Sequence, residues 1–202
     1  MTKVIGLTGG IGSGKTTITT ILEKQNIPII DTDLISRDVV KPSTEGLKQV
    51  VNYFSQECLN SNGTLNRAWM RNTIFNDAKA KLALEAILHP LIKRQTLQEI
   101  TKYKKTNPSH IIVAIPLLIE TIKKQTTRPG YIDEIWVVDC SVEQQITRAM
   151  QRDGNDRTLI EKIIAQQATR QERLQYADYV IDNTQSVKEL EQKLLNKLNK
   201  HI

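Results

Sequence analysis

A short apolar run followed by a glycine-rich loop is the feature that most constrains how this chain can fold. Residues 4–7 (Val-Ile-Gly-Leu) suffice for one buried strand, and residues 9–16 (Gly-Gly-Ile-Gly-Ser-Gly-Lys-Thr) match the phosphate-binding loop at every specified position. Glycines let the backbone direct several N–H groups at one phosphate. Ile18, Ile21 and Leu22 then show helical spacing, which brings the positive end of a helix dipole to the same anion. The sequence therefore predicts a nucleoside triphosphate site.

Within this loop, each residue type has a chemical reason to be there. The ammonium group of Lys15 would neutralise the β and γ phosphates of the nucleoside triphosphate, and the hydroxyl of Thr16 would hold Mg²⁺. A glycine turn without a ligand is the alternative, and the strand and helix on either side argue against it. The predicted nucleotide-binding residues are Gly12, Ser13, Gly14, Lys15, Thr16 and Thr17.

Four further apolar runs have the length of buried strands. They are residues 27–30, 111–115, 135–139 and 179–181. Helical segments separate the runs, so we predict an α/β fold with a five-stranded parallel sheet flanked by helices, and the loop of residues 9–16 makes it a P-loop fold.

Helical periodicity dominates residues 43–105, which is too long for a simple crossover and indicates a substrate-binding insertion. Pro90 lies inside its longest apolar-periodic stretch, residues 78–103, and should break or kink that helix. A closing helix should present one apolar face, formed by Val187, Leu190, Leu194, Leu195 and Leu198.

Two acids follow the second apolar run. Asp31 and Asp33 come where open α/β sheets place their ligands, and they would point the same way if the strand extended that far. Asp33 is the candidate general base for a hydroxyl that attacks the γ-phosphoryl group. The alternative is that these residues only begin a helix running from Leu34, with Asp33 or Thr32 as its cap.

Arginine becomes frequent between the last two predicted strands. Its planar guanidinium binds phosphate oxygens in pairs, which favours a phosphate-binding role for the cluster. Acidic residues lie between these arginines, so the alternative is a solvent-exposed face on which the arginines form ion pairs. Residues 153–156 (Asp-Gly-Asn-Asp) should interrupt the helices here and allow them to act as a lid. The cluster consists of Arg148, Arg152, Arg157, Arg170 and Arg173.

Composition limits the possible partners and the cellular setting less strongly. A formal charge of +6 and a pI near 9.3 suit a highly phosphorylated substrate or a nucleic acid, but no basic arm supports the second reading. Cys58 and Cys140 form no metal or redox spacing, which fits a reduced, cytoplasmic setting. No stretch has the pattern of a signal peptide or membrane span, so we expect no membrane and no nucleic-acid partner.

Several blocks together resemble the dephospho-coenzyme A kinase family. They are residues 7–16, the Asp31-Thr32-Asp33-x-Ile35-x-Arg37 segment, and the runs 89–92, 116–120 and 177–183. The resemblance covers nearly the whole chain. It implies ATP-dependent phosphorylation of the ribose 3′-hydroxyl of dephospho-coenzyme A, the last step of coenzyme A synthesis. A nucleoside or nucleoside-monophosphate kinase of the same fold is the alternative.

The resemblance also implies roles for single residues. Asp33 matches the base, Arg148 matches a lid arginine that faces the phosphates, and Arg37, His89 and Pro90 match positions near dephospho-coenzyme A. A lone histidine such as His89 is by itself more often a packing residue.

The implied single kinase domain spans residues 1–202 and has three parts. The core comprises residues 1–40, 109–147 and 176–202, the coenzyme-binding region 41–108, and the lid 148–175. Lid closure would bring Arg148 to the transferred group. The enzyme is expected to be a monomer or a weak homo-oligomer.

Overall fold

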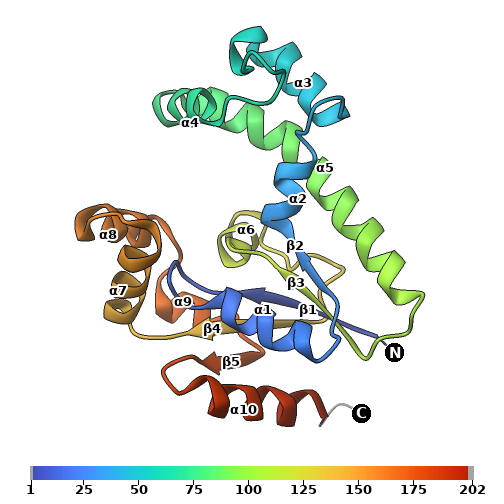
Figure 1. Cartoon of the computed structure of the whole chain (residues 1–202), viewed down its shortest axis with the longest axis vertical. Helices are drawn as coiled ribbons and strands as arrows, with labels where there is room; N and C mark the ends of the chain where they lie inside the picture. Colours follow the sequence, from blue (N-terminus) through green and yellow to red (C-terminus); the bar gives the residue numbers. More distant parts are fainter. Residues whose placement is uncertain (1, 200–202) are drawn as a thin grey trace. The chain divides into compact units, whose positions relative to one another are not determined.

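The computed structural model describes residues 2–199, and its centre is a parallel sheet of five strands in the order β2-β3-β1-β4-β5 (Figure 1). All five predicted strands are confirmed. They are β1 (Lys3–Thr8), β2 (Ile29–Asp31), β3 (His110–Ala114), β4 (Glu134–Asp139) and β5 (Tyr179–Asp182). Contacts divide the chain into two units: a core unit (Met1–Asp31 and Ile100–Ile202) and a helical unit (Thr32–Glu99).

Helices cover both faces of the sheet in the core unit, which explains why its strands are apolar on both sides. Trp136 and Val138 point to one face, with α1 (Lys15–Lys24) and α10 (Val187–Asn199), and Ile135 and Val137 point to the other, with α6 (Leu118–Gln125). Each fully buried side chain of this size contributes roughly 1.5–3 kcal/mol. Leu190, Leu194 and Leu198 of α10 are buried as predicted. Val187 is exposed, because it stands at the first position of the helix.

Three more helices of the core unit lie between β4 and β5. They are α7 (Val142–Asp153), α8 (Arg157–Gln166) and α9 (Arg170–Gln175). Gly154 ends α7 in a left-handed conformation, with φ of 67°, and Asp156 caps α8, so the predicted interruption at residues 153–156 is confirmed. Ile146 and Ile160 join α7 to α8. The predicted boundary between core and lid, at residues 147 and 148, falls inside α7.

The helical unit has its own apolar core. It contains α2 (Thr32–Asp38), α3 (Glu45–Phe54), a 3₁₀ turn (Gln56–Cys58), α4 (Arg67–Asn76) and most of α5 (Ala78–Lys104). Its buried residues include Val40, Leu47, Val50, Phe54, Met70 and Ala80.

The helix α5 passes through Pro90 without a break. Pro90 has no backbone N–H, so one hydrogen bond of the helix is missing at this position. The helix nevertheless continues on both sides of Pro90. The predicted region 41–108 differs from the observed unit, which also takes in α2 and leaves the last turn of α5 with the core.

The strand β2 ends too early for Asp31 and Asp33 to point the same way, as they would if the strand extended to both residues. β2 stops at Asp31 and α2 begins at Thr32, so Asp31 and Asp33 do not lie on one face of a strand. Thr32 and Asp33 both belong to the first turn of α2, and neither is the residue before it. The reason is that the helix starts one residue after the last sheet hydrogen bond.

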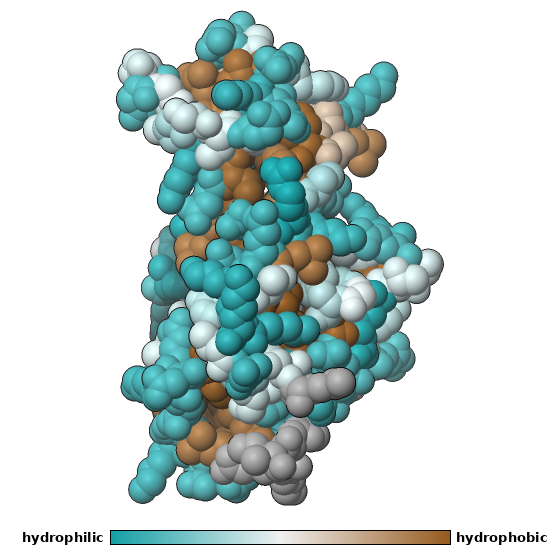
Figure 2. All heavy atoms as spheres, turned by 90° about the vertical axis from the view of Figure 1, so that its right-hand side faces the viewer, coloured by the Kyte–Doolittle hydropathy of each residue, from teal (hydrophilic) through white to brown (hydrophobic). Residues whose placement is uncertain are grey.

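Within residues 2–199, no helix combines the length and the apolar character that a membrane span requires. The face shown in Figure 2 is mostly hydrophilic, with apolar side chains scattered between polar ones.

Candidate active site

The glycine-rich loop connects β1 to α1 and curls in the way that only glycines allow. Gly12 and Gly14 have φ of 68° and 96°, and Gly14 is the residue immediately before the first turn of α1. The first N–H groups of α1, which have no acceptor within the helix, therefore lie at the loop. An anion bound there would accept hydrogen bonds from them. Nζ of Lys15 donates to the carbonyl oxygen of Gly9 at 2.6 Å, so this side chain folds back along the loop.

The loop rests on α7 and on the end of α8. A Cβ added to Gly12 would stand 2.2 Å from the carbonyl oxygen of Gln145, so the two backbones are in direct contact. The N–H of Ile11 donates to Oε1 of Gln167 at 3.0 Å. These contacts fix the loop against α7 and the end of α8.

Arg148 lies one helical turn beyond Gln145 and on the same side of α7. Its Nη2 donates to the carbonyl oxygen of Asn183 at 3.0 Å. Its Nη1 is buried and finds no hydrogen-bond partner among residues 2–199, and it lies 3.9 Å from the point that a Cβ on Gly14 would occupy. A buried cationic donor without a partner is costly, and an anion at the loop would satisfy it. Arg148 is already beside Gly14 in this structure, so its position there requires no lid movement.

The other four arginines of the cluster are engaged by the protein itself. Arg152 pairs with its neighbour Asp153, and Arg157 bridges Glu143 and Glu161. Arg152 and Arg157 therefore form ion pairs, which was the alternative interpretation of the arginine cluster.

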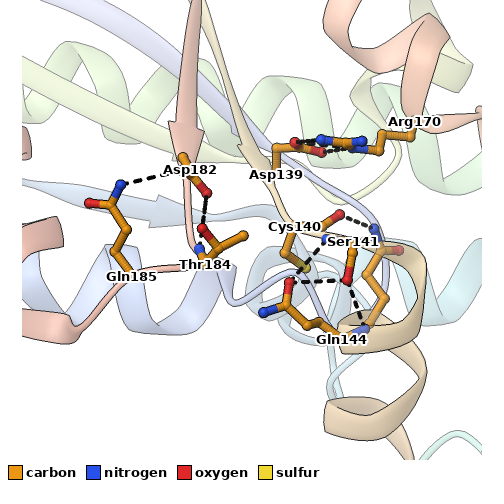
Figure 3. A network of polar contacts seen from close by, with 9 residues as sticks. Asp139, Cys140, Ser141, Gln144, Arg170, Asp182, Thr184 and Gln185 are labelled. Carbon is orange, nitrogen blue, oxygen red and sulfur yellow. Dashed lines mark hydrogen bonds and ion pairs between the residues drawn. The ribbon is translucent and has the colours of Figure 1, made fainter.

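Arg170 and Arg173 belong to α9. Arg170 grips the carboxylate of Asp139, with its closest contact at 2.6 Å, at the carboxyl end of β4 (Figure 3). This hydrogen bond raises the pKa of Arg170. Arg173 is buried behind Gly10 and donates to the carbonyl oxygen of Ala168, and burial lowers its pKa. Both guanidinium groups are bonded within the protein, whereas Nη1 of Arg148 is buried without a partner among residues 2–199.

The neighbouring strand ends are also polar, and Figure 3 shows how they are fixed. The carboxylate of Asp182 accepts from the N–H of Thr184 at 3.0 Å, and hydrogen bonding to Thr184 lowers its pKa. Ser141 and Gln144 form a capping box that starts α7. Cys140 lies between these groups, but burial raises the pKa of its thiol, which leaves it a packing residue.

The predicted acceptor-side residues all belong to the helical unit. Asp33 and Arg37 are four residues apart on α2, and His89 and Pro90 are adjacent on α5; all four are exposed. The same unit contains a pocket of about 290 Å³ between the end of α2, the start of α3 and the middle of α5. Its lining residues are Asp38, Val39, Thr44, Glu45, Gly46, Leu91, Arg94 and Gln95.

The sequence interpretation overlooked the side chains that support the loop. Asn183 lies in the run 177–183, and its place just after a predicted strand is a signal that could have pointed to a site. Gln145 and Gln167 carried no signal, because nothing in a helical pattern says which turn of α7 or α8 meets a loop more than 130 residues earlier in the chain.

Comparison with known proteins decides the family. A family model described as dephospho-CoA kinase matches residues 3–189, which include the helical unit and most of the core unit. The chain belongs to the dephospho-CoA kinase family. A dephospho-CoA kinase of Hydrogenovibrio crunogenus is 48% identical over 199 residues, covering 98% of each chain. One from Pasteurella multocida is 42% identical over 188 residues, covering 93% of this chain and 87% of the relative.

Solved structures share the fold of this chain. A crystal structure from Thermus thermophilus superposes with a TM-score of 0.82 at 26% identity, covering 98% of this chain and 97% of that one. Dephospho-CoA kinase from Campylobacter jejuni gives 0.71 at 24% identity, covering 99% and 97%, which supports the fold. This family member is therefore a kinase, and its family carries out the final step of coenzyme A biosynthesis.

Proposed function

We propose that this chain transfers the γ-phosphoryl group of ATP to the ribose 3′-hydroxyl of dephospho-coenzyme A, giving coenzyme A and ADP. The observation that carries the donor half is the buried, unpartnered Nη1 of Arg148 beside Gly14 of the loop. The family match over residues 3–189 carries the acceptor half.

The donor side acts through fixed positive groups. The N–H groups from Gly12 to Thr17 would surround the β and γ phosphates, and Lys15 would exchange its bond to Gly9 for phosphate oxygens. Arg148 would then stabilise charge on the transferred group. Phosphoryl transfer depends mainly on such positioning and charge stabilisation, so these residues need no covalent role.

The donor set suits Mg²⁺, the usual partner of ATP. Thr16 offers an exposed hydroxyl on the first turn of α1, and residues 2–199 contain no cluster of three or more acidic, histidine or cysteine ligands that would make an all-protein metal site. Mg²⁺ is usually held by one or two protein groups together with substrate phosphates. When bound, it would neutralise phosphate charge.

The acceptor side is assigned to the helical unit. Asp33 is an exposed carboxylate that could accept the proton of the 3′-hydroxyl, which makes that oxygen a better nucleophile. Arg37, His89 and Pro90 would contact dephospho-coenzyme A. The exposure of all four residues is compatible with ligand binding.

The test is a coupled assay of ADP release with ATP and Mg²⁺, run with dephospho-coenzyme A, adenosine or AMP as acceptor. We expect release only with dephospho-coenzyme A, and coenzyme A as the product by mass spectrometry. Equal release with adenosine or AMP would instead identify a nucleoside or nucleotide kinase. ATP hydrolysis stimulated by DNA or RNA would point to a nucleic-acid-linked ATPase.

A further inference from the structure

We propose that Asn183 is a positioning residue, which sets the direction of a phosphate-binding N–H in the loop and anchors Arg148 at the same time. The proposal rests on the proposed use of this loop for ATP. Asn183 follows β5 directly and is 7% exposed, so its amide is a buried polar group that requires partners. Its own N–H continues the sheet pattern by donating to the carbonyl oxygen of Asp139 at 2.9 Å.

The side-chain amide of Asn183 binds the loop. Nδ2 donates to the carbonyl oxygen of Ser13 at 2.7 Å, across 170 positions of sequence. The C=O and N–H of one trans peptide point in opposite directions. A bond that fixes the Ser13 oxygen therefore also fixes the N–H of Gly14, on the opposite side of that peptide plane.

This peptide has particular need of an anchor. Gly14 has no Cβ and a φ of 96°, so its backbone could turn to several other conformations at little cost. Because the N–H of Gly14 belongs to the loop, a turned peptide would present a carbonyl oxygen to the phosphates in place of a donor. Asn183 holds the peptide in one orientation before the nucleotide arrives.

Gly14 and Asn183 also fit each other sterically. A Cβ on Gly14 would lie 2.0 Å from Nδ2 of Asn183, so the amide occupies the space that the glycine leaves. This contact gives Gly14 a second reason to be glycine, besides its positive φ.

The backbone of Asn183 anchors Arg148, the second hydrogen-bond donor at the loop. Its carbonyl oxygen accepts from Nη2 of Arg148 at 3.0 Å, which leaves Nη1 buried and unpartnered among residues 2–199. One residue thus ties the loop and the arginine to the end of β5. Replacing the side chain removes the bond to Ser13 but keeps the carbonyl that binds Arg148, so the two effects can be separated.

The first experiment compares Asn183→Ala and Asn183→Asp with wild type by calorimetric titration of ATP and of dephospho-coenzyme A. For Asn183→Ala we expect ATP to bind on the order of 10-fold more weakly, the scale of one lost hydrogen bond, with dephospho-coenzyme A affinity unchanged. Asn183→Asp should be weaker still, because a carboxylate cannot donate to the Ser13 oxygen and repels the phosphates. Asn196→Ala, an exposed asparagine of α10, is the matched control and should bind like wild type.

A second experiment tests the steric fit by a double-mutant cycle on thermal stability. Gly14→Ala should lower the melting temperature less in the Asn183→Ala background than in wild type, because the clash with Nδ2 is gone and only the φ strain remains. Strictly additive shifts would overturn the claim that the amide fills this space. This measurement holds even if one variant no longer binds ATP.

The outcomes separate this inference from the proposed function. Unchanged ATP affinity in folded Asn183→Ala would overturn the positioning role, whatever the acceptor is. A wild-type protein that binds ATP but does not phosphorylate dephospho-coenzyme A would overturn the proposed acceptor, while the ATP titration would still test Asn183. An equal loss of affinity for both substrates would indicate a general loss of structure and would also count against the proposal.

Discussion

Gly12 lies directly against Gln145, the residue of α7 that supports the phosphate loop. A Cβ at Gly12 would come within 2.2 Å of the carbonyl oxygen of Gln145, and this backbone atom cannot move aside as the end of a side chain could. The loop is therefore built against α7, the helix that also carries Arg148. A side chain at position 12 would therefore force the loop and α7 apart.

We predict that Gly12→Ala destabilises the protein far more than Gly154→Ala. Both glycines are left-handed, with φ of 68° and 67°, but nothing lies within 4 Å of a Cβ on Gly154. Gly154→Ala should cost about 1 kcal/mol for the backbone conformation alone. Gly12→Ala should cost roughly 3 kcal/mol or more, since the clash is added. Urea unfolding of both variants makes the comparison, and equal losses would contradict the packing described here.

Arg148→Ala is expected to lower kcat by about 10²–10³-fold, because it removes a preorganised donor from the phosphate site. Affinity for dephospho-coenzyme A should change little. Arg152→Ala is the control on the same helix, since Arg152 is exposed and, within residues 2–199, its ion pair is with the neighbouring Asp153. Steady-state kinetics with each substrate varied in turn provides the measurement. Similar kcat values for the two variants would exclude the role proposed for Arg148.

Asp33→Asn should bind both substrates and turn over at least ~100-fold more slowly, the usual scale for loss of a general base. The change is isosteric and leaves the first turn of α2 intact. Asp153→Asn, in an exposed pair with Arg152, should keep wild-type turnover. Single-turnover assays separate chemistry from product release. Near-normal turnover of Asp33→Asn would remove Asp33 from the base role.

Acid should weaken the link between Lys3 of β1 and Glu134 of β4, which are 2.6 Å apart. Burial acts to raise the pKa of Glu134, but hydrogen bonds from Lys3 and Trp136 outweigh it and lower the pKa from 4.5 to about 2. A lowered carboxylate pKa contributes stability that is complete above pH 4.5 and is lost as the pH falls toward 2.

The variant that tests this link is Glu134→Gln. It should be less stable than wild type by on the order of 1 kcal/mol at pH 7, a value discounted because Lys3 is partly exposed. The difference in melting temperature should narrow between pH 4.5 and pH 3. Glu23→Gln, at an exposed position of α1, should show no such convergence. A wild-type advantage that stays constant down to pH 3 would be inconsistent with this pair.

Local patterns were sufficient to predict the strands. Each one is an apolar run bounded by polar or glycine residues, and burial on both faces makes that pattern independent of what packs on it. The loop of residues 9–16 was predictable for the same reason, since its conformation follows from its own glycines. Pro90 and the two-acid segment were harder, because a helix can absorb one missing N–H and a strand can end one residue early.

The sequence by itself determined the α/β sheet, the phosphate loop and the resemblance to the kinase family, because these depend on residues adjacent in the chain. Tertiary structure alone decided which arginine keeps a buried donor without a partner beside the loop. Arg152, Arg157 and Arg170 have carboxylate partners and Arg173 is buried behind Gly10, whereas Nη1 of Arg148 has no partner among residues 2–199. It also decided that Asn183 meets Ser13, since only the parallel sheet brings the end of β5 to the loop after β1. Contacts between distant segments depend on packing, and no local pattern encodes them.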